Sequence, residues 1–195
     1  MKYIAVTDPA LCARPLAEQV RRVLELPPEE ASGPGKLPRP DMVILRAKEL
    51  SDPEYERLAA EVIPLCRAAG VLCVLHSHAE TARRMEYPYF HCPLPMWKGL
   101  CGGPWRPKLL GISVHSREEA LLAASLGAGY LTAGHVFATD CKKGLPPRGL
   151  SFLKEVADAV QIPVYAIGGM NPGRAGAARE AGAAGFCVMS GYMRL

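Results

Sequence analysis

Residues 109–126 read Leu-Leu-Gly-Ile-Ser-Val-His-Ser-Arg-Glu-Glu-Ala-Leu-Leu-Ala-Ala-Ser-Leu and pass from one kind of secondary structure to another. The run Leu109–Val114 is almost continuously apolar, which is typical of a parallel strand covered on both faces. Ser116 followed by Glu119 is the pattern of a helix N-terminus, where both side chains cap backbone N–H groups. The stretch therefore predicts a strand, a loop that contains His115, and a helix.

The same alternation extends along the chain in both directions. Seven more short apolar runs lie at Tyr3–Thr7, Met42–Arg46, Val71–Leu75, Tyr89–Cys92, Gly129–Gly134, Pro163–Ile167 and Gly185–Met189. Helical patterns lie between runs, as in Asp52–Ala69, Ser116–Leu126 and Gly149–Val160. Eight strands alternating with helices predict a single α/β domain over residues 1–195, folded as a (β/α)8 TIM barrel. An open doubly wound sheet is the alternative, but no Gly-x-Gly-x-x-Gly follows the first strand.

Three places depart from a regular barrel. Pro27–Pro40 contains five prolines and reads as an extended loop. Pro93–Pro107 is rich in proline, glycine and tryptophan, which predicts an irregular fourth helix. The chain ends six residues after the last strand, so we expect a truncated last helix. The flank that this helix would cover then needs another cover, such as a partner subunit.

The composition limits what kind of protein this is. Its 195 residues fit one domain, and 49% hydrophobic against 22% charged residues suffice to build a core. A net charge of +4, spread over scattered lysines and arginines, predicts no nucleic-acid partner. No apolar stretch reaches the ~18 residues of a membrane helix and no signal peptide is recognised, so no membrane partner is expected. Seven cysteines without a Cys-x-x-Cys pair favour free thiols in a reducing cytoplasm.

All five histidines are expected at the carboxyl ends of strands, where barrels of this class carry their chemistry. They are His76, His78, His91, His115 and His135. A metal site is one alternative, because His76, His78 and His91 together with Cys92 offer ligands that zinc accepts. However, no carboxylate accompanies this set, and we expect no metal.

Cations accompany one of these histidines. The loop Gly134–Gly144 carries His135 and the adjacent Lys142 and Lys143, so a titratable group stands beside two charges that could hold an anion. A solvated loop face is the alternative for the lysines. Cys141, beside them, lacks the other features of a nucleophile.

A second cationic pair ends the second predicted strand. Arg46 and Lys48 are two residues apart and share a face if the chain is extended there. Arg46 would point into the barrel mouth, where a charge needs an anionic partner. A salt bridge from Arg46 to Glu49 or Asp8 is the alternative.

Small residues follow the last two strands. Gly168-Gly169 comes after the seventh strand, and Ser190-Gly191 comes after the eighth. In barrels these two loops commonly bind a phosphate through backbone N–H groups, and glycine permits the close approach. Their placement together predicts a phosphate site.

The chain resembles the thiamine phosphate synthase/TenI superfamily of small barrels over nearly its whole length. The matching segments are Tyr3–Asp8, Ile44–Lys48, Gly111–Ser116, Ala166–Met170 and Val188–Gly191. The loop after the sixth strand separates the branches of the superfamily. Thiamine phosphate synthases usually have Gly-Pro there, whereas this chain has Gly134-His135 and looks like the TenI branch, whose activity is thiazole tautomerase.

The resemblance also bears on a metal. Synthases carry an Asn-Asp pair after the third strand and a further Asp after the fourth, which serve Mg²⁺ and pyrophosphate. Here these positions read His76-Ser77 and His91–Met96, without a carboxylate. Mg²⁺ requires hard oxygen ligands, so the synthase reaction is not the first expectation.

The resemblance therefore implies a thiazole tautomerase of thiamine biosynthesis, an isomerase. It would convert a 2-carboxythiazole phosphate tautomer to its aromatic form without a cofactor. Moving a proton needs a group that titrates near neutral pH, so we assign His135 as the general acid/base. The substrate-binding residues are expected to be Arg46, Lys48, His76, Ser113, Thr139, Lys142, Gly168, Gly169, Met189, Ser190 and Gly191.

Two other functions stay open. A thiamine phosphate synthase would condense a pyrimidine pyrophosphate with a thiazole phosphate in a Mg²⁺-dependent reaction. A non-catalytic regulatory protein would bind thiazole phosphate or thiamine phosphate without turnover. For a DNA-binding regulator we find neither a helix-turn-helix nor a basic stripe. In each case a small-molecule phosphate is the expected partner, and a homodimer is the expected assembly.

Overall fold

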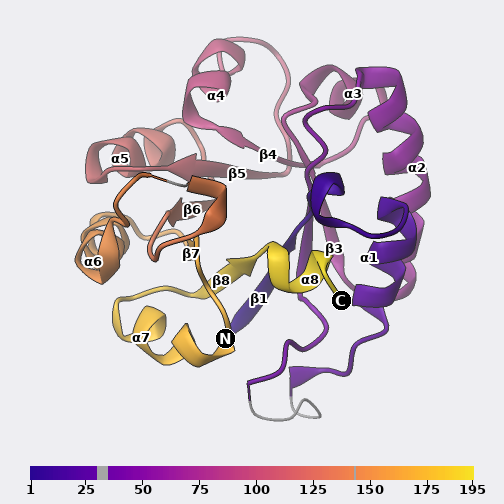
Figure 1. The fold of residues 1–195 in the computed structure, drawn as a ribbon. Coiled ribbons are helices and arrows are strands. Elements are labelled where there is room, and N and C mark those ends of the chain that lie inside the picture. The colour runs from indigo at the N-terminus through magenta and orange to yellow at the C-terminus, as the bar shows by residue number, and fades with distance from the viewer. Residues whose placement is uncertain (30–34, 143) are drawn as a thin grey trace.

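A computed structural model describes residues 1–29, 35–142 and 144–195, with only the backbone of Cys141. Eight parallel strands form one closed barrel in which each strand pairs with its neighbours in sequence, and β8 closes the ring on β1. The helices lie outside this ring of strands (Figure 1). The predicted (β/α)8 barrel is confirmed.

The bounds agree closely with the sequence patterns. The strands are β1 (Lys2–Val6), β2 (Met42–Leu45), β3 (Leu72–His76), β4 (Tyr89–Pro93), β5 (Leu109–Val114), β6 (Tyr130–Gly134), β7 (Val164–Ile167) and β8 (Gly185–Val188). The α-helices are α1 (Leu16–Leu24), α2 (Asp52–Ala68), α3 (Ala79–Arg84), α4 (Leu94–Leu100), α5 (Arg117–Ser125), α6 (Gly149–Ala159), α7 (Ala175–Glu180) and α8 (Ser190–Met193). Short 3-10 turns lie at η1 (Pro9–Leu11), η3 (Asp140–Lys142) and η4 (Pro172–Arg174).

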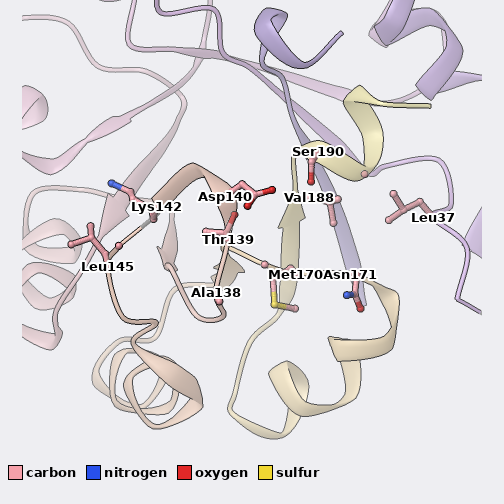
Figure 2. Close-up of a pocket in the computed structure, with 13 residues that line it drawn as sticks. Leu37, Ala138, Thr139, Asp140, Lys142, Leu145, Met170, Asn171, Val188 and Ser190 are labelled. Carbon is pink, nitrogen blue, oxygen red and sulfur yellow. The ribbon is translucent and has the colours of Figure 1, made fainter. Parts of the chain in front are cut away.

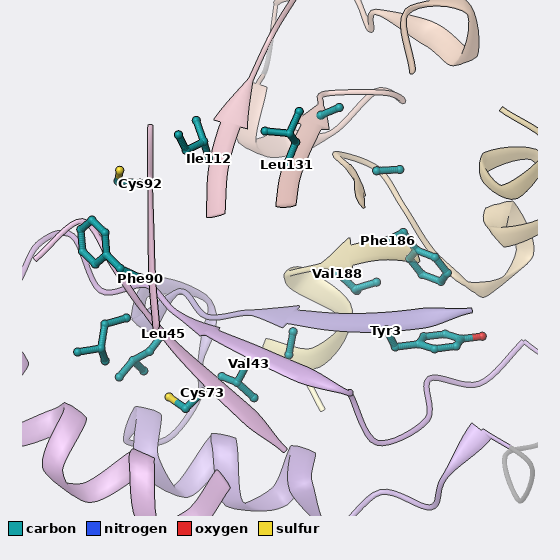
Figure 3. Close-up of a cluster of buried hydrophobic side chains, with 14 of the residues drawn as sticks. Tyr3, Val43, Leu45, Cys73, Phe90, Cys92, Ile112, Leu131, Phe186 and Val188 are labelled. Carbon is teal, nitrogen blue, oxygen red and sulfur yellow. The ribbon is translucent and has the colours of Figure 1, made fainter. Parts of the chain in front are cut away.

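Two apolar cores hold the barrel together. Side chains on alternate strand positions point outward and pack against the helices, as Val43, Leu45 and Cys73 do in Figure 3. The remaining positions point inward and form a second cluster, made of Ile4, Val6, Met42, Ile44, Val74, Tyr130 and Cys187. The inner cluster fills the lower part of the barrel, so any ligand site must lie above it, near the carboxyl ends of the strands.

The fourth helix is short rather than absent. α4 occupies seven residues of the proline-rich segment, and Pro95 lies in its first turn, where a missing N–H group is tolerated. Residues 101–108 then continue without helix. The predicted helix start at Ser116 is confirmed, since its side chain accepts a hydrogen bond from the Glu119 N–H group. The Glu119 carboxylate reaches the N–H group of His115 instead of that of Ser116.

The truncated last helix is covered from within the chain. α8 has four residues, and the fully buried Gln19 of α1 donates a hydrogen bond to the Tyr192 carbonyl at 2.6 Å. The Tyr192 hydroxyl donates to the Pro38 carbonyl at 2.9 Å, and Arg14 donates to the carbonyl of Leu195 at 2.8 Å. Figure 1 shows the C-terminus beside α1. The homodimer therefore stays a prediction, and the flank of α8 gives no reason for it.

In the described part of the chain, no helix is long and apolar enough to cross a membrane.

Candidate active site

A cavity of about 540 Å³ opens at the carboxyl ends of the strands. Its wall includes almost every residue that was predicted to bind a substrate, from Arg46 after β2 round to Ser190 after β8. A second cavity of about 560 Å³ adjoins it and shares Thr139, Lys142, Gly169 and Ser190. In Figure 2 the loop that carries Thr139, Asp140 and Lys142 lies on one side of this second cavity, and Ser190 and Leu37 lie on the other. Gly191 lines the second cavity but not the first.

One side of the mouth is cationic. The Thr7 hydroxyl donates to the Arg46 carbonyl and accepts from the Arg46 N–H group, both at 2.7 Å, and so fixes the residue after β2. The Arg46 side chain borders the cavity and pairs with Asp8 at 3.0 Å, one of the two partners considered from sequence. Lys48 is 61% exposed and lies 3.5 Å from Glu49, so that ion pair is weak.

The opposite side of the mouth is formed by the backbone of two loops, at Gly168-Gly169 and Ser190-Gly191. Gly168 and Gly169 have φ values of +95° and +63°, which favour glycine. A Cβ atom on Gly168 would lie 2.3 Å from the Cβ atom of His135, and one on Gly169 would lie 2.5 Å from the Ala138 carbonyl oxygen. Ser190 and Gly191 open α8, where the first N–H groups have no intrahelical partner. This side therefore offers N–H groups in a place where a phosphate can approach.

The floor of the cavity is a hydrogen-bonded network. His91 accepts or donates at both ring nitrogens: Nδ1 lies 2.9 Å from the Tyr130 hydroxyl, and Nε2 lies 2.9 Å from Ser113 Oγ. Thr132 Oγ1 donates to Ser113 Oγ at 3.1 Å. Gly111 makes room for the pair, because a Cβ atom there would lie 2.1 Å from the Tyr130 ring. Burial lowers the pKa of His91 well below its usual value, so its ring stays neutral.

His76 stands beside this network at the end of β3. Its N–H group donates to the hydroxyl of the buried Tyr55, which itself donates to the Leu45 carbonyl, so α2 fixes the ends of β2 and β3. The His76 ring stacks on that of His91 with centroids 5.4 Å apart. Burial, then the charge of Arg46, lowers the pKa of His76 to about 4. Its Nδ1 is buried and has no hydrogen-bond partner among the described residues.

The other histidines occupy different places in the structure. His78 turns away from the cavity, stacks on Tyr55 and pairs with Asp52 at 2.7 Å. His115 lies at the rim, 3.4 Å from the Glu119 carboxylate. His91 lies inside β4 instead of at its end. Among the side chains that the structure describes, no three His, Cys, Asp or Glu residues group closely enough to hold a metal ion, so these side chains give no support to the zinc alternative.

His135 lies at the cavity rim directly after β6. Its Nε2 is 3.3 Å from the Leu145 carbonyl oxygen, and its backbone carbonyl accepts from the Arg148 N–H group at 3.0 Å. These contacts tie the two ends of the loop between β6 and α6 together. Of the predicted lysine pair, Lys142 lines both cavities, while Lys143 and the side chain of Cys141 lie outside the described residues.

The resemblance raises Mg²⁺ as a ligand of this site, and the residues present do not fit it. The two positions where synthases carry acids are occupied by Ser77, directly after His76, and by the end of β4, and neither offers a carboxylate. Asp8, near the mouth, is already paired with Arg46. Neutral imidazole is a poor ligand for this hard cation.

Sequence reasoning missed Thr132 and Tyr130, which support the floor. The signal was available in the alternation of β6, because Tyr130, Thr132 and Gly134 occupy every second position and so share the inner face. The run looked continuously apolar, which concealed this alternation.

Comparisons with known proteins agree on one family. The family profile described as thiamine monophosphate synthase matches residues 3–192. A thiamine-phosphate synthase of Syntrophomonas wolfei is 33% identical over 98% of this chain and 87% of that protein. One of Moorella thermoacetica is 33% identical over 96% of this chain and 85% of that protein. The structure of a thiamine phosphate pyrophosphorylase from Pyrococcus furiosus superimposes with a TM-score of 0.78 at 28% identity, covering 100% of this chain and 88% of that one.

These names correct the predicted reaction. The similar proteins are synthases, which are transferases, so the expectation of a thiazole tautomerase, an isomerase, is wrong. That expectation depended on the loop Gly134–Gly144 and on the missing carboxylates at His76-Ser77 and His91–Met96, whereas the comparisons weigh the whole chain. The acid/base role of His135 loses its basis as well, because that role was assigned for the proton transfer of the isomerisation.

Proposed function

The chain belongs to the thiamine monophosphate synthase family, and on that premise we propose that it is a thiamine-phosphate synthase. The substrates are a pyrimidine that carries a diphosphate and a thiazole phosphate. A carbon–nitrogen bond forms between the thiazole nitrogen and the methylene carbon of the pyrimidine. The carbon–oxygen bond to the diphosphate breaks, and pyrophosphate leaves with the electron pair.

The observation that carries this proposal is the two-sided mouth. Arg46 and Lys48 supply positive charge at the end of β2, while Gly168, Gly169 and Ser190 supply backbone at the ends of β7 and β8. Both sides border one cavity, so two phosphorylated groups can bind at once with their reacting ends between them.

The residues divide the work according to their chemistry. Arg46, Lys48 and Lys142 hold the diphosphate and stabilise the negative charge that grows on it as its bond breaks. The loops at Gly168 and Ser190 hold the thiazole phosphate through N–H groups. His135 positions the loop that carries Thr139 and Lys142, through its contact with Leu145.

Incubation of the purified chain with both substrates, with and without MgCl₂, tests the proposal by detection of thiamine phosphate and pyrophosphate. We expect Lys48→Ala to lower kcat/KM about tenfold or more, as the loss of a charged hydrogen bond would. Lys154→Ala is the matched control, because Lys154 pairs with Asp158 on the outer helix α6. No thiamine phosphate under either condition would contradict the proposal.

A second candidate is a binder of thiamine-type phosphates without turnover. The poor fit of the site to Mg²⁺ favours it, because Ser77 and the end of β4 offer no carboxylate where synthases have acids. Tight binding of thiamine phosphate together with the absence of condensation would identify this case.

We also propose that the protein works in the cytoplasm on small molecules, as a homodimer, without a nucleic-acid or membrane partner. The six cysteines whose side chains are described are free thiols, which supports a reducing compartment.

A further inference from the structure

His76 presents a hydrogen-bond donor to the cavity. A neutral imidazole carries one proton, on either Nδ1 or Nε2. Nδ1 is buried and unpartnered among the described residues, so a proton there would be a buried N–H group with no acceptor. The proton therefore belongs on Nε2, and because the ring borders the cavity, this is the edge that can meet a ligand.

Ser113 presents a second donor. The Tyr130 hydroxyl has no acceptor other than His91 Nδ1 in the described part of the chain, so it donates there. His91 must then carry its proton on Nε2 and donate it to Ser113 Oγ, which also accepts from Thr132. With both acceptor positions used, the Ser113 hydroxyl hydrogen is left to point toward a ligand.

The two donors lie close together. His91 links them, because its ring stacks on that of His76 with centroids 5.4 Å apart and its Nε2 lies 2.9 Å from Ser113 Oγ. Arg46 and Lys48, which follow β2, and Lys142, from the loop after β6, line the same cavity. Asp8 balances the charge of Arg46. Floor and rim thus offer donors and cations, which suit phosphoryl oxygens and do not suit a divalent cation.

We propose that this cavity binds a diphosphate directly, without a divalent cation, through His76 and Ser113 at the floor and Arg46, Lys48 and Lys142 at the rim. This inference rests on the proposed function, which supplies the diphosphate. Ser77 offers no carboxylate where synthases of this superfamily carry one, so the phosphoryl oxygens contact the protein itself instead of a metal ion.

Calorimetric titration of the full chain with inorganic pyrophosphate at pH 7.5 tests this, once in EDTA and once in MgCl₂. We expect binding in EDTA and no tighter binding in MgCl₂, which sequesters the ligand. Binding in MgCl₂ with none in EDTA would overturn the proposal. This comparison uses the unaltered protein, so it decides the matter even where a variant misfolds.

Variants then locate the donor. We expect His76→Asn to weaken binding in EDTA about tenfold, the effect of one lost hydrogen bond to a charged group. The double variant His76→Asn with Ser77→Asp restores the Asn-Asp pair that synthases carry after the third strand, and its pyrophosphate binding should become Mg²⁺-dependent. His78→Asn is the control, because His78 stacks on Tyr55 away from the cavity, and its affinity should stay within about twofold. Equal affinity of the His76→Asn variant and the unaltered protein would contradict the role of His76.

The two proposals fail separately. Pyrophosphate binding in EDTA without formation of thiamine phosphate would remove the synthase and leave the diphosphate site. Formation of thiamine phosphate, combined with pyrophosphate binding that requires Mg²⁺, would support the synthase and contradict the metal-independent diphosphate site.

Discussion

Gly168 shows how one residue can determine a binding loop. Its φ of +95° and the 2.3 Å approach of the His135 Cβ atom leave no space for a side chain. We expect Gly168→Ala to lower the free energy of unfolding by about 1–3 kcal/mol and to abolish inorganic phosphate binding, because the loop must move away from His135. Urea unfolding and calorimetry measure the two effects.

Gly176→Ala is the matched control for this change. Gly176 lies in α7, and a Cβ atom there meets nothing within 4 Å. Alanine is the better helix former, so the variant should be as stable as the unaltered chain or up to about 1 kcal/mol more stable, with unchanged phosphate binding. Equal behaviour of the two alanine variants would mean that the close packing of Gly168 on His135 is unimportant.

His76 makes the stability of the fold depend on pH. Its pKa is about 4 in the native state against 6.5 for a free histidine, so the unfolded chain binds more protons between these values. The stabilisation of about 3 kcal/mol is complete above pH 6.5 and is lost as the pH falls toward 4. We expect urea midpoints at pH 7.5, 6.5 and 5.5 to fall less for His76→Asn than for the unaltered chain. Gln161→Ala, at an exposed residue that does not titrate, should keep the unaltered slope.

The roles of single residues were the hardest part to predict from the sequence. Alternation on a strand indicates that Arg46 and His76 face inward, but it does not indicate that Thr7 fixes Arg46 or that Tyr55 fixes His76. Those contacts join residues 39 and 21 positions apart, and only the closed barrel brings them together. The predicted reaction was wrong for a related reason, because one loop motif and a few missing carboxylates do not determine the chemistry of the whole site.

At the scale of elements, sequence reasoning worked well because each element is locally determined. Strand runs are apolar on both faces, and the N-terminus of α5 carries its own cap at Ser116. The closure of the flank at α8 could not be predicted, because it depends on Gln19, a polar residue on an otherwise ordinary helix.

That closure gives a test at the same scale. Gln19→Ala leaves the Tyr192 carbonyl without its partner and opens a cavity under α8, so we expect a loss of about 2 kcal/mol in the free energy of unfolding. Urea unfolding measures it, with the exposed Gln161→Ala as the control. A loss no larger than that of the control would mean that α8 is secured by its apolar contacts alone.

For the whole molecule, the inner cluster around Ile44, Val74 and Tyr130 closes the barrel below the cavity. In the proposed synthase reaction, both substrates would therefore enter, and both products would leave, through the same end. The substrate that reaches His76 and Ser113 has to bind before the thiazole phosphate covers the mouth, and its pyrophosphate has to leave after thiamine phosphate.

The consequence is a compulsory order of binding. In steady-state kinetics, pyrophosphate should inhibit competitively against the pyrimidine substrate, and thiamine phosphate should inhibit noncompetitively against it. Competitive inhibition by both products would indicate that substrates bind in random order. A barrel filled at one end thus sets the sequence of events in the reaction as well as the shape of the site.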